Sequence, residues 1–312
     1  MRSRQAFTRY AWAFLAFNVL VIVWGALVRA TGSGAGCGAH WPLCNGEWIP
    51  VHPQFHTIIE LTHRVMSGLA LAGVIVLWLW SLRSYPKGSW VRKAAAASLV
   101  LTLSEALIGA GLVLLRLVAQ NASSWRAAYL SVHLTNTFLL LASLSATAAW
   151  SQAAPAQWIQ SSKTRVAYAL GLAGFLVVGV SGGIAALGDT LFPSTSLRGG
   201  IARDFSSSSH FLIRLRVIHP LLAAGIGLYL GALAIHGLSA RRPVVRGLAS
   251  ALAAIIVCQW GIGLWNLTWL APIPLQLVHL AAADALWIIL VLYSLTVLTT
   301  ETSPARGPSP SS

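Results

Sequence analysis

Charged side chains are scarce in this chain. Of its 312 residues, 21 are Lys or Arg and 7 are Asp or Glu, so charged residues make up only 9%, against about 25% in an average soluble domain. Apolar residues make up 56%, and the mean hydropathy is +0.72. Such a composition excludes a disordered chain, a coiled coil and an ordinary soluble enzyme. A protein of the lipid bilayer remains.

Cysteines are also few. Two of the three, Cys37 and Cys44, lie close together in the segment "GSGAGCGAHWPLCNGEW", and Cys258 lies in an apolar segment, where we expect a small apolar filler. Two thiols without a second pair make a zinc site improbable. If the Cys37–Cys44 segment faces an oxidising compartment, a disulfide is expected. The sequence leaves open whether that bond is structural or redox-active.

Eight apolar segments are long enough to cross a bilayer as helices, which takes about 20 residues. We place them at about 10–28, 57–82, 94–117, 127–150, 166–187, 215–236, 247–270 and 274–299. The first follows a short basic tail without a clear cleavage site, so we expect a retained anchor. The longest loops fall at about 29–56 and 188–213, which leaves no room for a soluble domain. The Pro- and Ser-rich tail at 303–312 is expected to be disordered.

The excess of basic residues gives a formal net charge of +14. A nucleic-acid partner would be one explanation, but membrane topology is sufficient, because Lys and Arg gather on the cytoplasmic side. Of the 21 basic residues, 13 lie in the tails and even-numbered loops, 7 in the odd-numbered loops, and Arg64 within a span. We therefore predict a multi-pass protein of the cell membrane with both termini in the cytoplasm, the cysteine loop outside, and no nucleic-acid partner.

The first four spans resemble the last four. Matched residues occur in the same order at similar offsets: Glu105 with Gln259, Gly109 with Gly263, His63 with His219, and His133 with His279. Each half has four spans and so keeps one orientation, which places the relating axis along the membrane normal. We predict an all-α integral membrane protein of two pseudo-symmetric four-helix bundles, with halves at 1–160 and 161–302.

The repeat singles out four of the nine histidines, each near the outer end of a span. Neutral imidazole is a common ligand of heme iron, and two histidines on facing helices of a bundle can hold one heme. A hydrogen bond to a neighbouring helix is the alternative. Polar groups within spans are costly and tend to be functional. We therefore expect His63 with His133, and His219 with His279, to be two pairs of iron ligands.

One helix face carries Glu60, His63 and Arg64. A carboxylate one turn from an iron ligand can act as acid, base or charge stabiliser. The alternative is a Glu60–Arg64 pair worth about 0.2–0.5 kcal/mol. In the second half Arg216 takes the place of Glu60. The first half is therefore the candidate for catalysis, and the second for holding a heme, with Arg216 near a propionate.

Two further acids, Glu105 and Asp284, lie within spans. Both are expected to face the interior of a bundle and to be paired or protonated there, because an exposed charge in lipid is costly. Their roles are left open.

The segments "WGALVRATGSGAGCGAHWPLC" and "IIELTHRVMSGL" resemble the heme A synthase family, membrane enzymes that convert heme O to heme A for terminal oxidases. The resemblance extends over essentially all eight spans. It implies that heme O, the substrate, binds near His63 and His133 and that Glu60 is the essential carboxylate. It also implies a resident heme b between His219 and His279.

The resemblance further implies that Cys37 and Cys44 act in disulfide exchange or substrate delivery. Arg64 and Arg216 are our further candidates for contacts with the cofactors. Expected partners are the heme O synthase that supplies the substrate and a membrane electron donor, while a homo-oligomer is left open. One departure is the loop before the sixth span, which lacks cysteines. The alternative functions are a non-catalytic diheme cytochrome b that transfers electrons, and a transporter built on a duplicated bundle.

Overall fold

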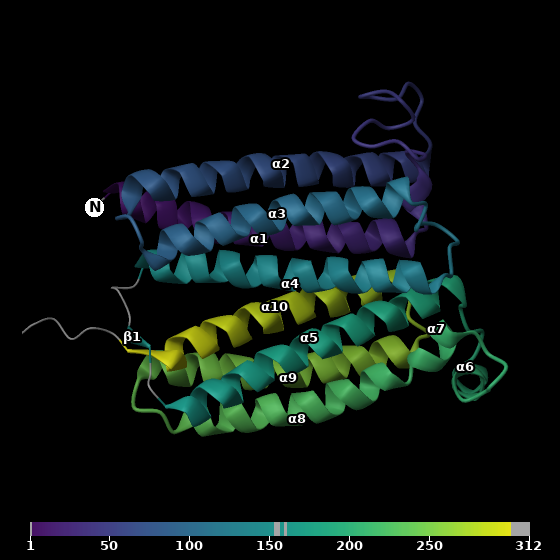
Figure 1. The fold of residues 1–312 in the computed structure, drawn as a ribbon. Helices are drawn as coiled ribbons and strands as arrows, with labels where there is room; N and C mark the ends of the chain where they lie inside the picture. The colour runs from purple at the N-terminus through teal and green to yellow at the C-terminus, as the bar shows by residue number, and fades with distance from the viewer. Residues whose placement is uncertain (1, 153–156, 159–160, 301–312) are drawn as a thin grey trace, which may run out of the picture.

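The computed structural model describes residues 2–152, 157–158 and 161–300, and it is almost entirely helical over them (Figure 1). The predicted tail at 303–312 lies outside the described residues. In chain order the elements are α1 (Arg2–Ala30), the short 3-10 helix η1 (Ser33–Ala35), α2 (Phe55–Ser84), α3 (Trp90–Leu114), α4 (Ser124–Gln152), β1 (Gln157–Trp158), α5 (Ser162–Leu191), α6 (Leu197–Asp204), α7 (Phe211–Leu215), α8 (Ile218–Leu238), α9 (Pro243–Thr268), α10 (Ile273–Leu298) and β2 (Thr299–Thr300).

Eight helical segments of the described chain are long and apolar enough to cross a membrane, which confirms the predicted all-α membrane protein. The sixth span consists of α7 and α8, which are separated just before Pro220. Proline is tolerated in the first turn of a helix but not in its interior, so the break follows from the sequence. The loop predicted at 188–213 is not wholly irregular, because it contains α6.

Local sequence explains where several helices begin. The side chain of Ser89 accepts a hydrogen bond from the amide of Arg92 at the start of α3, and Ser161 does the same for Thr164 at the start of α5. Such caps satisfy amides that have no partner within the helix. Pro243 opens α9, at a position where its missing N–H costs nothing.

The spans form two groups of four (Figure 1). In the first group, α1 contacts α2, α2 contacts α3, α3 contacts α4, and α4 contacts α1. In the second group, α5, α8, α9 and α10 contact one another in the same cyclic order. The groups meet through α1 and α4 on one side and α5 and α10 on the other. This is the arrangement expected of a duplicated bundle, while strict pseudo-symmetry and the boundary at residue 160 stay predictions.

The centre of the core lies where the two groups meet. Phe138 on α4, Phe175 on α5 and Trp287 on α10 are buried against one another, with ring centroids 5.2–5.6 Å apart. The indole Nε1 of Trp287 donates a hydrogen bond of 2.6 Å to the carbonyl oxygen of Phe138. Outward-facing positions carry exposed leucines such as Leu107 and Leu221, which suit a lipid environment.

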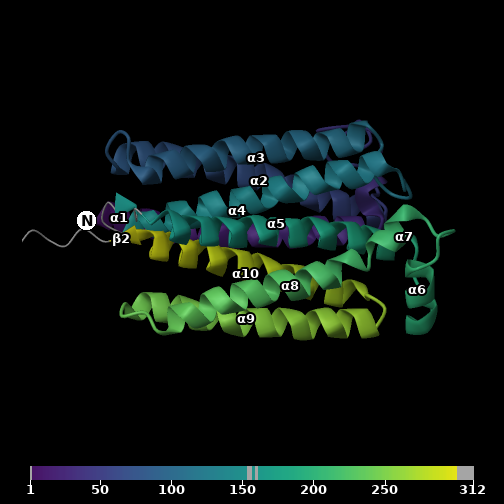
Figure 2. The same cartoon turned by 60° about the horizontal axis from the view of Figure 1, so that its bottom comes forward.

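The two ends of the molecule differ (Figures 1 and 2). At one end lie the start of α1 and the short pairing of β1 with β2, which joins the connection between the two groups to the end of α10. At the other end lie the cysteine loop, α6 and α7. The predicted histidine ligands lie towards this second end, because α2 and α8 begin there with His63 and His219 close behind.

Candidate functional site

A buried carboxylate on α2 is held from two sides. Glu60 is only 3% exposed. Its Oε1 accepts hydrogen bonds from Arg64, at 2.5 Å from Nη2 and 3.2 Å from Nε. Its Oε2 accepts one from the backbone amide of Cys37, at 2.8 Å. Sequence spacing offered a Glu60–Arg64 pair as the alternative to a catalytic carboxylate, and the structure contains that pair, so the catalytic role of Glu60 stays a prediction. The amide of Cys37 comes from a loop whose path the sequence did not reveal.

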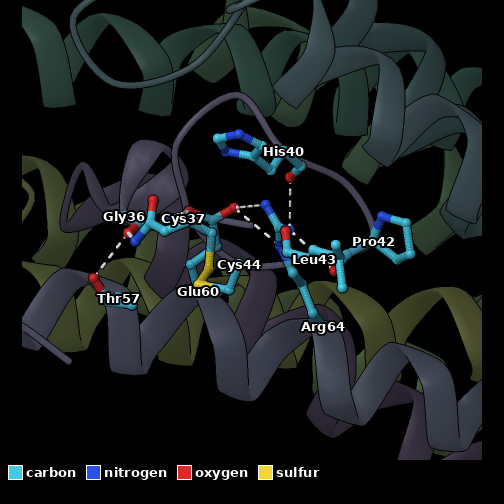
Figure 3. Close-up of a disulfide and its surroundings, with 10 residues drawn as sticks. Gly36, Cys37, His40, Pro42, Leu43, Cys44, Thr57, Glu60 and Arg64 are labelled. Atoms are coloured by element: carbon cyan, nitrogen blue, oxygen red, sulfur yellow. Dashed lines mark hydrogen bonds and ion pairs between the residues drawn. A yellow bond between two sulfur atoms is a disulfide. The ribbon is translucent and has the colours of Figure 1, made fainter. Parts of the chain in front are cut away.

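The cysteine loop packs onto this pair (Figure 3). Cys37 and Cys44 form a disulfide, as predicted. Arg64 Nη1 donates to the carbonyl oxygens of Leu43 at 2.7 Å and His40 at 2.8 Å. One guanidinium therefore fixes both the carboxylate of Glu60 and the loop above it. The predicted contact of Arg64 with a cofactor stays a prediction.

The first histidine pair lies within the first group of helices. His63 on α2 and His133 on α4 are carried by helices that both contact α1 and α3. The Nδ1 atoms of both rings are buried and lack a well-formed hydrogen bond among the described residues. For His133, the nearest acidic atom is Oε1 of Glu105, at 3.3 Å from Nδ1.

In the second histidine pair the two imidazole rings lie close to each other. The ring centroids of His219 and His279 lie 6.2 Å apart, with the ring planes at 85°. A metal–imidazole bond is about 2 Å long, so two imidazoles on opposite sides of one iron have centroids roughly 6 Å apart. His219 Nδ1 also lies 3.1 Å from Oγ of Ser181 on α5. This partner is of the kind that orients a metal-binding imidazole.

A glycine on a neighbouring helix faces the Cε1 edge of each of these four imidazoles. The distances from a Cβ built on the glycine to Cε1 are 2.9 Å for Gly25 and His63, 3.8 Å for Gly109 and His133, 2.9 Å for Gly182 and His219, and 3.1 Å for Gly263 and His279. Larger residues at three of these positions would press on the rings. The sequence repeat matched Gly109 with Gly263. Gly25 and Gly182 open the similar segments "GALVRATG" and "GGIAALG" at the ends of the first and fifth spans.

These observations fit heme ligation by two histidines in each half. Each half offers two partly buried imidazoles on non-adjacent helices of a bundle, and glycines lie beside the rings. Within the described part of the chain, no three His, Cys, Asp or Glu side chains gather to hold a bare metal ion. A heme needs only axial ligands from the protein, since the porphyrin supplies the other four nitrogens.

Arginines near the end of the molecule that carries the cysteine loop have protein partners. Arg216 donates to Asp189 at 2.9 Å and to Asp204 at 2.7 Å, so its guanidinium is shared by two carboxylates. Its proposed contact with a propionate stays a prediction. Arg29, which the sequence did not single out, extends from α1 to the second group and donates to Thr190 at 2.7 Å and to Gln276 at 3.0 Å.

The sequence predictions for Asp284 and Cys258, both within spans, had different outcomes. Asp284 is fully buried on α10, as predicted, and neither carboxylate oxygen has a hydrogen-bond partner among the described residues. Cys258 is exposed on α9 and does not fill the core. The prediction of a buried filler was wrong, because the helical face that carries Cys258 is turned away from the neighbouring helices.

Comparisons with known proteins show what the chain as a whole is similar to. A family model described as cytochrome oxidase assembly protein matches residues 8–291. A Thermus thermophilus protein named protoheme IX farnesyltransferase is 46% identical over 293 residues, which cover 93% of this chain and 48% of that protein. The chain thus spans about half the length of that relative.

Over shorter stretches the chain is similar to proteins named heme A synthase. The one from Alkalihalophilus pseudofirmus is 44% identical over 95 residues, which cover 30% of this chain and 32% of the relative. The one from Geobacillus kaustophilus is 45% identical over 95 residues, 30% of each chain.

Proposed function

The chain belongs to the family of cytochrome oxidase assembly proteins, and we propose that it is a heme A synthase, an oxidoreductase that converts a ring methyl group of heme O to a formyl group by successive hydroxylations. The family match agrees with the resemblance found in the sequence. Heme O is the substrate, and the product serves the assembly of a terminal oxidase.

The buried carboxylate beside one histidine pair carries this proposal. Glu60 lies one helical turn from His63, and its counterpart in the second half is Arg216. Charge-assisted hydrogen bonds from Arg64 and the amide of Cys37 hold Glu60 in place. A carboxylate fixed beside a bound substrate can accept the proton that leaves the substrate at each oxidation. A protein that only carries electrons has no need of such a group.

The second half is proposed to hold heme b between His219 and His279. When bound there, heme b supplies one-electron transfer. Ser181 orients His219 through Nδ1, and Gln259 Nε2 donates to the backbone carbonyl of His279 at 3.1 Å. The first contact orients the ring of His219, the second holds the backbone of His279, and both partners are neutral.

The proposed orientation places both termini in the cytoplasm and the disulfide loop outside. The distribution of Lys and Arg supports this orientation. The disulfide also supports it, because such bonds persist in oxidising compartments. The electron donor is proposed to be a membrane component, and the enzyme that makes heme O a partner.

Farnesyl transfer, suggested by the name of the Thermus relative, is less well supported. Prenyl diphosphates are usually held by Mg²⁺ on carboxylates. Of the acidic side chains in the described spans and their loops, Asp189 and Asp204 share Arg216, and Glu60 pairs with Arg64. We infer that the transferase activity of that relative belongs to the part this chain does not match.

Pigment analysis of cells or vesicles that contain the full chain and a supply of heme O tests the proposal. The wild type is expected to yield heme A. Glu60→Gln is expected to yield none while keeping the absorbance of heme b. Glu47→Gln is the matched control, because Glu47 is an exposed glutamate in the loop that carries the disulfide.

Two results would overturn the proposal. If a folded wild type loaded with heme leaves heme O unchanged when a reductant is supplied, the chain is a diheme electron carrier. If protoheme and farnesyl diphosphate yield heme O in the presence of this chain alone, the farnesyltransferase name applies to it.

A further inference from the structure

A second acidic side chain contacts the first histidine pair from the opposite side of the bundle. Glu105 lies on α3, and its Oε1 is 3.3 Å from Nδ1 of His133 on α4. The contact falls short of hydrogen-bond geometry, and His133 Nδ1 has no better-placed partner among the described residues. A small rotation of either side chain would align the N–H with the carboxylate.

The carboxylate of Glu105 is fixed by the helix that carries the histidine. Asn136 Nδ2 donates to its Oε2, and Thr137 Oγ1 donates to its Oε1. Asn136 is itself held, because Ser104 Oγ donates to its Oδ1 at 2.6 Å. Residues one turn beyond His133 therefore aim Glu105 at the back of the imidazole ring.

The second half has no such carboxylate. The residue that matches Glu105 is Gln259, and its Nε2 donates to the backbone carbonyl of His279 at 3.1 Å. Nδ1 of His279 is buried without a partner in the described structure. The two halves thus share their histidines and differ in the charge placed behind one of them.

We propose that Glu105 is a positioning residue that accepts a hydrogen bond from Nδ1–H of His133 and thereby strengthens that imidazole as a ligand of the substrate heme. This inference rests on the proposed function, together with the expectation that heme O binds between His63 and His133, and it takes Nε2 of His133 as the atom that would bind the iron. A carboxylate behind a metal-binding histidine fixes its tautomer and raises its basicity. A more basic ligand favours ferric over ferrous iron.

The consequence is a difference in reduction potential between the two sites. In the first half the carboxylate of Glu105 lies behind one imidazole, whereas the described hydrogen-bond partners of His219 and His279 are neutral. The couple concerned is the one-electron reduction of ferric to ferrous iron. For such a couple a tenfold change in the ratio of the two forms corresponds to about 59 mV.

The test is a redox titration of the full chain carrying His279→Ala and loaded with heme O, so that only the first half holds a heme. Glu105→Gln keeps the shape of the side chain and removes its charge. The ratio of ferric to ferrous heme at a fixed potential should therefore fall about tenfold. This corresponds to a midpoint potential about 59 mV higher than that of the parent. Thr137→Val, which removes one anchor of Glu105, should shift the midpoint in the same direction by less.

The outcomes separate this inference from the proposed function. If His133→Ala in the same background binds heme O as well as its parent, the assignment of the ligand fails and the proposed function fails with it. If His133 is required and Glu105→Gln leaves the midpoint unchanged, the inference alone is overturned. Lower heme occupancy at an unchanged midpoint would also overturn it, since Glu105 would then serve only helix packing.

Discussion

Gly182 on α5 is the position where a single added methyl group should weaken the binding of heme b. A Cβ built there lies 2.9 Å from Cε1 of His219, well inside van der Waals contact. In the heme-free protein the imidazole can turn away. Once the ring is bound to iron it cannot, so the strain falls on the bound state. Overpacking of this kind costs about 1–3 kcal/mol.

Because about 1.4 kcal/mol is a factor of ten in affinity, Gly182→Ala should bind heme b about 5- to 140-fold more weakly. Titration of the heme-free full chain with heme b, followed by absorbance, measures this directly. Gly231→Ala on α8 is a control, because a Cβ there meets nothing within 4 Å. Both substitutions gain the same helix propensity, about 0.8–1.0 kcal/mol, so the comparison isolates the contact.

Gly109→Ala is a second control, at another of the four glycines that face a histidine ring. Its Cβ would lie 3.8 Å from Cε1 of His133, which is an ordinary van der Waals contact. We expect it to leave heme O binding unchanged. If Gly182→Ala binds heme b as tightly as Gly231→Ala does, the imidazole of His219 does not keep the position described here when heme is bound, and the argument is refuted.

Three further predictions concern the ligands and the loop. His219→Ala or His279→Ala should each lower the content of bound heme b, measured by pigment extraction, and unchanged content in both would remove their assignment. Arg64→Gln leaves Glu60 without its charged partner, so it should abolish heme A formation and destabilise the protein by about 3–5 kcal/mol, measured by thermal unfolding with Arg83→Gln as control. Cys37→Ser should reduce heme A formation at unchanged heme b content, because an opened loop no longer holds its amide on Glu60, and full activity would leave the disulfide only a structural or dispensable role.

The sequence predicted much of the fold because bilayer physics allows few solutions. Eight apolar runs of sufficient length gave the eight spans, and the order of matched residues gave the two groups of four. Short features that depend on tertiary contacts were missed. The helix α6 is polar and only eight residues long, and nothing in its pattern separates it from a loop.

The sequence named the residue types of the candidate site, which stay predictions, and it revealed few of the contacts between them. Spacing along a helix placed Glu60 next to Arg64, because residues four apart share a face. It could not show that the amide of Cys37 would reach the same carboxylate, since loop conformation is not periodic. Nor could it show that Glu105 lies behind His133, because that contact depends on how α3 packs on α4.

The contacts between the two groups have one more consequence. The first and last helix of each group form the junction: α1 with α10, α4 with α5, α4 with α10 and α1 with α5. Exchanging the groups turns this set of contacts into itself, as in a homodimer with a two-fold axis, where the same patch is used by both subunits. A four-helix ancestor could therefore have paired with a copy of itself through these faces.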